Sequence, residues 1–136
     1  MSDTANKPRP QFRNINVTDL MKYRLPMAGK VSILHRVSGA LLFLCLPILI
    51  ALFAMSFVSQ AGFNALAMVT GHPIVKVILL VLIWGYLHHF CAGIRYLILD
   101  LHIGLDKESA AKSASLVMGV SLALTLVFGL KLFGVW

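Results

Sequence analysis

The sequence predicts an all-α integral membrane protein with three transmembrane helices. Of its 136 residues, 59% are hydrophobic and only 12% are charged, whereas soluble domains carry about 25% charged residues. The apolar residues also gather into three runs, and roughly 20 apolar residues suffice to cross the hydrocarbon core of a bilayer as a helix. Together these observations exclude an ordinary soluble domain.

Residues 1–30 form the first predicted region, a basic segment in the cytoplasm. Residues 1–15 are polar and contain prolines, so we expect them to be extended or disordered. Thr18 and Asp19 can begin a short helix on the membrane surface that ends or bends at Pro26; a loop held by interfacial side chains is the alternative. The region contains no apolar run, so no cleavable signal peptide is predicted.

Residues 31–136 form the second predicted region, the membrane anchor domain. Pro47 should kink its first span, which neighbouring helices can accommodate. Residues 59–72, between the first two spans, are predicted to be a loop. The predicted spans cover about 31–58, 73–99 and 113–135.

Basic residues predict how the chain is oriented in the membrane. Most of the 12 lysines and arginines precede residue 37, residues 59–72 contain none, and the second loop carries Lys107 and Lys112. The positive-inside rule therefore places the N-terminus and the second loop in the cytoplasm. Lys131 is the exception, and its side chain can snorkel outward from the last turn.

Charge and motifs exclude several function classes. The net charge of +7 does not indicate nucleic-acid binding, because the basic residues form no stripe interleaved with aromatic residues. The sequence contains no GxGxxG, P-loop, CxxC or HExxH motif and no suitably spaced nucleophile and base. Hydrolysis and nucleotide chemistry are therefore not predicted for this chain.

The end of the second span carries polar residues that hydrocarbon tolerates only with a partner, a cofactor or a water path. Gly85 and Gly93 lie one turn before and after His89 and leave room for a flat group, as when an imidazole ligates the iron of a haem. The alternative is that the glycines permit close helix packing and the histidine bonds a neighbour. Helical spacing sorts these residues into two adjacent stripes: His89, Gly93, Tyr96 and Asp100 in one, and His88, Ala92 and Arg95 in the other.

A second polar set lies at the cytoplasmic edge of the first span. Ser32 and Arg36 are one turn apart, with His35 beside them. A hydroxyl, an imidazole and a guanidinium can bind a carbonyl or a carboxylate at the water boundary. The alternative is that Arg36 snorkels to lipid phosphate and Ser32 caps the helix.

The depth of His89 predicts that a haem bound by two histidines is shared with another polypeptide. His89 lies about ten residues, roughly 15 Å, from the cytoplasmic end of its helix. The same depth is expected near residues 45–47 and 121–125 of the other spans, and neither stretch contains a histidine. His35 is expected to be too shallow, and His72 and His102 fall in loops.

Two motifs in this architecture resemble the cytochrome b556 membrane anchors of succinate dehydrogenase, respiratory complex II. They are SILHRVSG at residues 32–39 and HFCAGIRYLILD at residues 89–100. The resemblance covers nearly the whole chain, from the basic leader through the three spans.

The resemblance implies a subunit without the catalytic centre, in the inner membrane of a bacterial cell. A flavoprotein subunit would oxidise succinate to fumarate in the tricarboxylic acid cycle, and an iron–sulfur subunit would pass the electrons to ubiquinone in the respiratory chain. A second hydrophobic three-span anchor would complete the helical bundle. Haem b would lie between the two anchors, and the partner would supply the other axial histidine.

The resemblance also assigns roles by position. His89 matches the axial ligand of the haem iron, and His35 and Arg36 match positions near the haem propionates. Ser32 and Arg36 match positions that line the ubiquinone pocket. There the Ser32 hydroxyl would bond a quinone carbonyl, and Arg36 would stabilise the negative charge of a partly reduced quinone.

Other positions of the motifs are less informative. His88 is the weaker ligand candidate, because relatives can carry another residue there. Tyr96 stands where some members have histidine. Asp100 matches a family position without an assigned role and is expected to pair with Arg95 or Lys107. Two other functions stay open: the anchor of a quinol:fumarate reductase, and a structural anchor without a cofactor.

Overall fold

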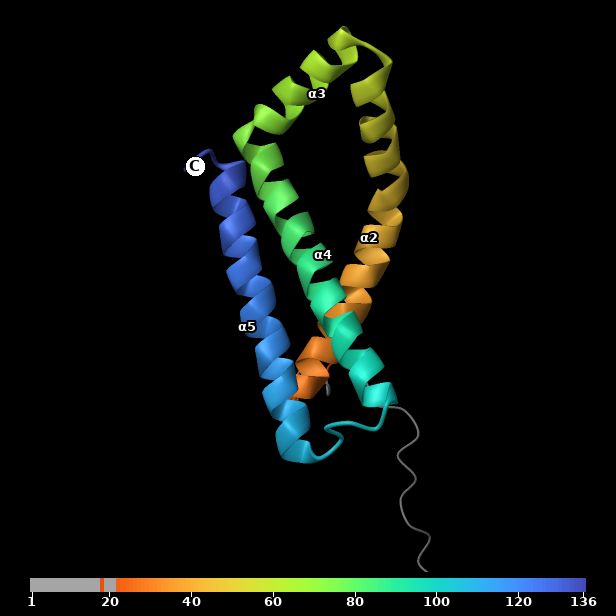
Figure 1. Ribbon diagram of the computed structural model, residues 1–136, viewed down its shortest axis with the longest axis vertical. Coiled ribbons are helices and arrows are strands. Elements are labelled where there is room, and N and C mark those ends of the chain that lie inside the picture. Colours follow the sequence, from red (N-terminus) through yellow and green to blue (C-terminus); the bar gives the residue numbers. More distant parts are fainter. Residues whose placement is uncertain (1–17, 19–21) are drawn as a thin grey trace, which may run out of the picture.

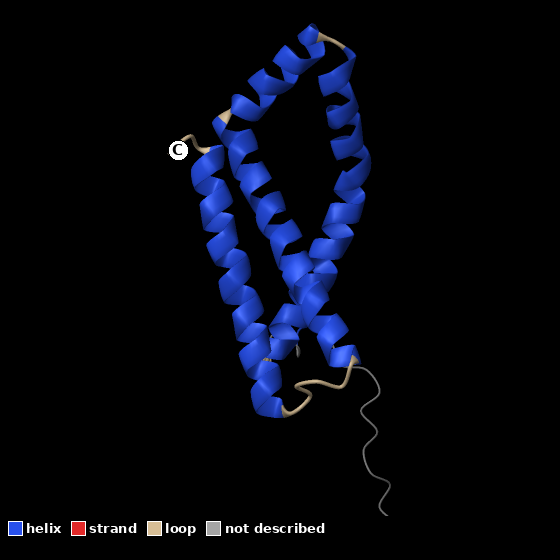
Figure 2. Cartoon of the chain, in the orientation of Figure 1, coloured by secondary structure: helices blue, strands red, loops and turns tan. Residues whose placement is uncertain are grey.

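The three predicted spans are three long helices in the computed structural model, which describes residues 18 and 22–136 (Figures 1 and 2). Most of the predicted basic region lies outside the described residues, and so do residues 19–21, so the surface helix predicted to begin at Thr18 and Asp19 stays a prediction. The described part of the chain contains no strand. Its helices are α2 (Met27–Val58), α3 (Gln60–Gly71), α4 (Pro73–Asp100) and α5 (Lys107–Leu132).

The helices α2, α4 and α5 are each long and apolar enough to cross a membrane. They contain 32, 28 and 26 residues, so even the shortest is about 39 Å long at 1.5 Å per residue. The predicted class, an all-α membrane protein with three spans, is therefore confirmed. The exact membrane limits of each span stay a prediction.

The prediction of a loop at residues 59–72 is wrong, because α3 occupies most of it. The Ser59 hydroxyl caps this helix by accepting a hydrogen bond from the Gly62 amide at 3.0 Å. The segment also contains alanine, leucine and methionine, which favour a helix, and no proline. With 12 residues, α3 is too short to be a fourth span.

Two spanning helices begin earlier than their predicted spans. The N-cap of α2 is Pro26, without a side-chain cap. Ser32 therefore lies inside the helix, and the proposal that it caps α2 is wrong. The Asp106 carboxylate caps α5 by accepting a hydrogen bond from the Ser109 amide at 2.9 Å. This bond holds the pKa of Asp106 below its ordinary value. Pro47 leaves α2 unbroken, although the helix follows a curved path in Figure 1.

The helices α2 and α4 cross near one end of the molecule and separate toward α3, while α5 lies alongside α4 (Figure 1). Small residues fill the point where the three helices meet. The buried apolar cluster there consists of Val31, Ala92, Ala114 and Val117. Because these side chains are short, the helix backbones can approach closely at the crossing.

Candidate functional site

The crossing of α2 and α4 brings the two polar motifs together. The Nδ1 atom of His89 lies 3.0 Å from the backbone oxygen of His35 and 3.4 Å from the Ser38 hydroxyl. The imidazole rings of His35 and His89 stack, with centroids 4.2 Å apart and planes 8° from parallel. The ring of Tyr96 lies 5.0 Å from that of His35. Residues from both motifs therefore share one site.

The hydrogen bond to His35 decides which ring nitrogen of His89 carries the hydrogen. A carbonyl oxygen can only accept, so Nδ1 of His89 must carry the proton that it donates. The lone pair of the neutral ring then resides on Nε2, for which no hydrogen-bond partner is found among the described residues. An imidazole with Nδ1 tied to a backbone oxygen and Nε2 free is the form that ligates a metal. His89 therefore fits the role of an axial haem ligand.

One glycine makes room for the His89 ring. A Cβ atom at Gly39 would lie 2.7 Å from Cε1 and 3.2 Å from Nδ1 of His89. By contrast, a Cβ at Gly93 would be 3.8 Å from the His35 ring, and one at Gly85 would be 4.0 Å from Ser38. The last two glycines thus face α2 side chains. These ordinary contact distances fit close helix packing, which was the alternative explanation, and the room for a flat group beside them stays a prediction.

The prediction that His89 lies level with residues 45–47 of the first span is wrong. Ser38 lies 11 residues after the start of α2, and His89 lies 11 residues before the end of α4. The contacts of His89 with His35 and Ser38 place it level with residues 35–39 and not with 45–47. His35 is deep enough to contact His89, contrary to expectation. However, rings stacked at 4.2 Å leave no space for a porphyrin between them, so His35 cannot be the opposite axial ligand.

Ser32 and Arg36 lie on α2 beside this site and keep their polar groups free. Ser32 is half-buried and Arg36 is exposed. Within the part of the chain that the structure describes, neither side chain forms a hydrogen bond or an ion pair. The chain thus presents a hydroxyl and a guanidinium at its surface, and a closed pocket around them would need another subunit.

His88 points in a different direction from His89. Its side chain is completely buried, with the Trp84 ring 5.5 Å away. Neither of its ring nitrogens has a hydrogen-bond partner among the residues that the structure describes. A ring enclosed on all sides offers no face to a porphyrin, which supports ranking His88 below His89.

The expected ion pair of Asp100 with Arg95 or Lys107 does not form. Arg95 turns instead toward α5, where Nε donates to the Ser113 hydroxyl at 2.9 Å and Nη2 to the backbone oxygen of Ala110 at 3.2 Å. The described residues contain one ion pair, between Lys112 and Glu108 at 2.7 Å. Asp100 therefore has no electrostatic partner within the described chain.

Sequence reasoning gave no role to Ser38 and Gly39, although both belong to the first motif. Their spacing could have identified them, because they follow His35 by three and four residues and therefore share its helix face. Two small residues on the face of a histidine indicate where a second helix can approach. The sequence did not indicate that the approaching residue is His89.

Comparisons with known proteins show the family of this chain. Residues 6–128 match the model of the family described as succinate dehydrogenase/fumarate reductase transmembrane subunit. The chain is 33% identical to the succinate dehydrogenase cytochrome b556 subunit of Coxiella burnetii, over 91% of this chain and 95% of the relative. It is 28% identical to the subunit of the same name from Paracoccus denitrificans, over 93% and 94% of the two chains. Because the family model matches most of its length, this chain belongs to the succinate dehydrogenase/fumarate reductase transmembrane subunit family.

Proposed function

We propose that this chain is the cytochrome b556 anchor of a succinate dehydrogenase, which holds one side of a haem b and forms part of a ubiquinone site. The names of its relatives support this assignment. The observation that carries it is the His89 ring, whose Nδ1 is tied to the His35 oxygen at 3.0 Å. Haem b, when bound, transfers single electrons.

In this proposal the chain's own residues position the haem and balance its charge. His89 ligates the iron through Nε2, while the bond from Nδ1 fixes the plane of its ring. His35 and the exposed Arg36 lie near the propionates, where a cation stabilises a carboxylate. A histidine of a second anchor subunit would complete the ligands of the iron. His72 and His102 lie at the two ends of α4, outside the helix, and are too far along the chain from His89 to serve.

Ser32 and Arg36 form this chain's share of the ubiquinone site. The hydroxyl of Ser32 donates to a quinone carbonyl, and the Arg36 guanidinium stabilises the negative charge that develops on reduction. Their lack of partners within the described chain supports this role. The end of the molecule that carries them faces the cytoplasm of a bacterial cell, where the iron–sulfur and flavoprotein subunits dock on the inner membrane.

Two alternatives make different predictions. An anchor of a fumarate reductase would belong to the same family, but the relatives named above are subunits of succinate dehydrogenase, which favours succinate oxidation. A purely structural anchor would bind no cofactor. The reduced-minus-oxidised spectrum of the intact complex separates this last alternative from our proposal, because only a haem protein shows a b-type band.

The haem assignment is tested by replacing each neighbouring histidine in the complete complex. We expect His89→Ala to lose the b-type band and His88→Ala to keep it, with subunit ratios on a gel confirming assembly of both. Added imidazole should restore part of the band in His89→Ala by occupying the space of the lost ligand. An undiminished band in His89→Ala, or no band in the wild-type complex, would refute the assignment.

The quinone assignment is tested by separating two activities. Ser32→Ala and Arg36→Leu should lower ubiquinone reduction, each by about 100-fold if the group acts as a preorganised donor. Succinate oxidation by an artificial dye should stay unchanged, because the dye takes electrons before the membrane site. Ser115→Ala and Lys112→Leu, at exposed positions on α5, serve as controls. Normal quinone reduction in both site variants would exclude these roles.

A further inference from the structure

Arg95 carries a buried positive charge without a counter-charge. Its side chain is only 7% exposed, and it lies five residues before the end of α4. Its acceptors, the Ser113 hydroxyl and the Ala110 carbonyl, are both neutral. Among residues 18 and 22–136, no acceptor binds Nη1 of Arg95 and no carboxylate pairs with the guanidinium. A guanidinium in apolar surroundings is costly unless an anion neutralises it.

The carboxylates at this end of the molecule do not supply that anion. Asp106 bonds the Ser109 amide as the cap of α5, and Glu108 pairs with Lys112. Asp100, the last residue of α4, makes no ion pair with Arg95. None of the described carboxylates therefore neutralises Arg95.

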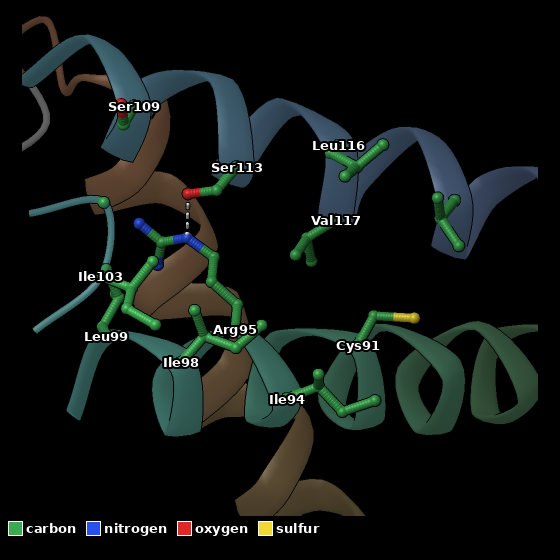
Figure 3. Close-up of a pocket in the computed structure, with 12 residues that line it drawn as sticks. Cys91, Ile94, Arg95, Ile98, Leu99, Ile103, Ser109, Ser113, Leu116 and Val117 are labelled. Carbon is green, nitrogen blue, oxygen red and sulfur yellow. Dashed lines mark hydrogen bonds between the residues drawn. The ribbon is translucent and has the colours of Figure 1, made fainter. Parts of the chain in front are cut away.

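An apolar groove of about 360 Å³ begins at Arg95 and runs between α4 and α5. Figure 3 shows the Arg95 side chain extending from α4 toward Ser113, with Ile98, Leu99 and Ile103 near its guanidinium. Cys91, Leu116 and Val117 lie further along the groove, away from the guanidinium. The groove therefore combines one cation at its end with a long hydrocarbon-like wall.

This groove opens away from the site of His89. At about 100° per residue, Ile94 and Ile98 lie roughly 140° and 180° around α4 from His89. Their exposed fractions are 45% and 44%, and that of Leu116, on the facing helix, is 67%. If the second anchor covers the His89 face, as the proposed function requires, the groove faces lipid.

We propose that this groove binds one anionic phospholipid of the leaflet nearest Arg95. The phosphate accepts hydrogen bonds from the Arg95 guanidinium, which Ser113 and Ala110 hold in place. One acyl chain lies along Ile94, Leu116 and Val120. An anionic phospholipid matches both features, because its acyl chain is joined to a phosphate at the depth of the headgroups and no headgroup cation neutralises that phosphate.

The test measures the phospholipid retained by the complete complex. The complex is equilibrated with vesicles of phosphatidylcholine and phosphatidylglycerol, purified in mild detergent, and its lipids are quantified by mass spectrometry. We expect one phosphatidylglycerol per chain above the level set by the vesicle composition. Arg95→Gln should lower this excess about five-fold, and Val120→Phe should lower it by filling the groove while Arg95 remains. Lys112→Gln removes an exposed charge outside the groove and should change nothing.

Several results would overturn the inference. These are no excess of phosphatidylglycerol in the wild type, an unchanged excess in both Arg95→Gln and Val120→Phe, an equal loss in Lys112→Gln, or displacement of the lipid by inorganic phosphate alone. If Arg95→Gln fails to assemble, Val120→Phe still decides the question.

The haem spectrum of the same samples distinguishes this inference from the proposed function. A wild-type complex that shows the b-type band but no excess lipid refutes only this inference. A wild-type complex that retains the lipid but shows no band refutes only the proposed function.

Discussion

The two ends of this molecule differ in composition and in packing, and the more apolar end is the one that packs less. At the crossing end, formed by residues 27–40 and 84–121, the helices bury both apolar and polar side chains. At the α3 end, formed by residues 41–83 and 122–136, Gly129 is the one buried residue. Large side chains such as Phe43 and Phe57, each 74% exposed, cover the α3 end instead.

The difference shows that hydrophobicity alone does not bring these helices together. In lipid an exposed leucine gains nothing by moving against another helix, so close packing depends on small residues and hydrogen bonds. The crossing end has both, in Ser38, Gly39, Ala92 and Ala114. Its contacts also hold the polar groups of the candidate site, whereas the α3 end leaves its apolar surface to lipid or to another subunit.

The largest effect is expected from a side chain at Gly39. Gly39→Val places carbon atoms against the His89 ring, which its hydrogen bond holds in position, so α2 and α4 must separate. We expect a loss of about 3 kcal/mol in the free energy of unfolding and loss of the b-type haem band, measured by detergent denaturation and difference spectroscopy. Gly119→Val is the control, since a Cβ there meets nothing within 4 Å. Equal effects of both variants would show that the crossing is not tightly packed.

Removing the hydrogen bond from Arg95 to the Ser113 hydroxyl on α5 is expected to lower the stability by a smaller amount. Ser113→Ala removes the acceptor of Nε but leaves the Ala110 oxygen, so we expect a loss of about 1.5 kcal/mol. Ser115→Ala is a matched control, because that exposed hydroxyl bonds only the backbone of its own helix. Denaturation midpoints of the two variants in detergent compare them directly. If Ser113→Ala were as stable as Ser115→Ala, the contact between α4 and α5 would not depend on this bond.

The cap of α5 should make stability depend on pH. Since folding lowers the pKa of Asp106, its charged form stabilises the folded state above the ordinary value of 3.8. This contribution is lost as the pH falls through the lowered pKa. Asp106→Ala should therefore melt below the wild type at neutral pH, and the difference should shrink in acid. Asp106→Asn keeps a cap without the charge and should melt independently of this titration. A difference between Asp106→Ala and the wild type that does not vary with pH would contradict this explanation.

The smallest effect is expected at the α3 end. A Cβ atom at Gly129 would lie 2.9 Å from Cδ1 of Leu80, but that methyl ends a flexible side chain with free space beside it. Alanine also favours the helix over glycine by about 1 kcal/mol. Gly129→Ala should thus leave the denaturation midpoint nearly unchanged, in contrast to Gly39→Val. A large loss would mean that the α3 end is packed as tightly as the crossing.

Some of the fold followed directly from particular residues. The three spans were predictable because each apolar run is long enough to cross a bilayer. The helix at 60–71 did not follow from hydrophobic length, because its 12 residues are too few to cross a bilayer, although Ser59 is a good helix cap. The early starts of α2 and α5 were missed because basic residues at their ends were assigned to flanking segments.

The candidate site was predicted as two separate motifs. The roles of Ser32, His35, Arg36 and His89 toward haem and quinone stay predictions. The sequence could not indicate that His89 stacks on His35, since the level of α4 against α2 depends on where each helix begins. The helix α2 begins at Met27 instead of about residue 31, and its crossing with α4 places His89 beside Ser38 instead of residue 45.

The amino-acid sequence by itself determined that this chain crosses a membrane three times, because hydrophobic length is a local property of each segment. It also determined which polar residues need a partner. The tertiary structure alone decided which of them meet: His89 with His35, and Arg95 with Ser113 in place of Asp100. The physical reason is that side chains up to 54 residues apart become neighbours through the crossing of helices, and small residues on both helices set that crossing.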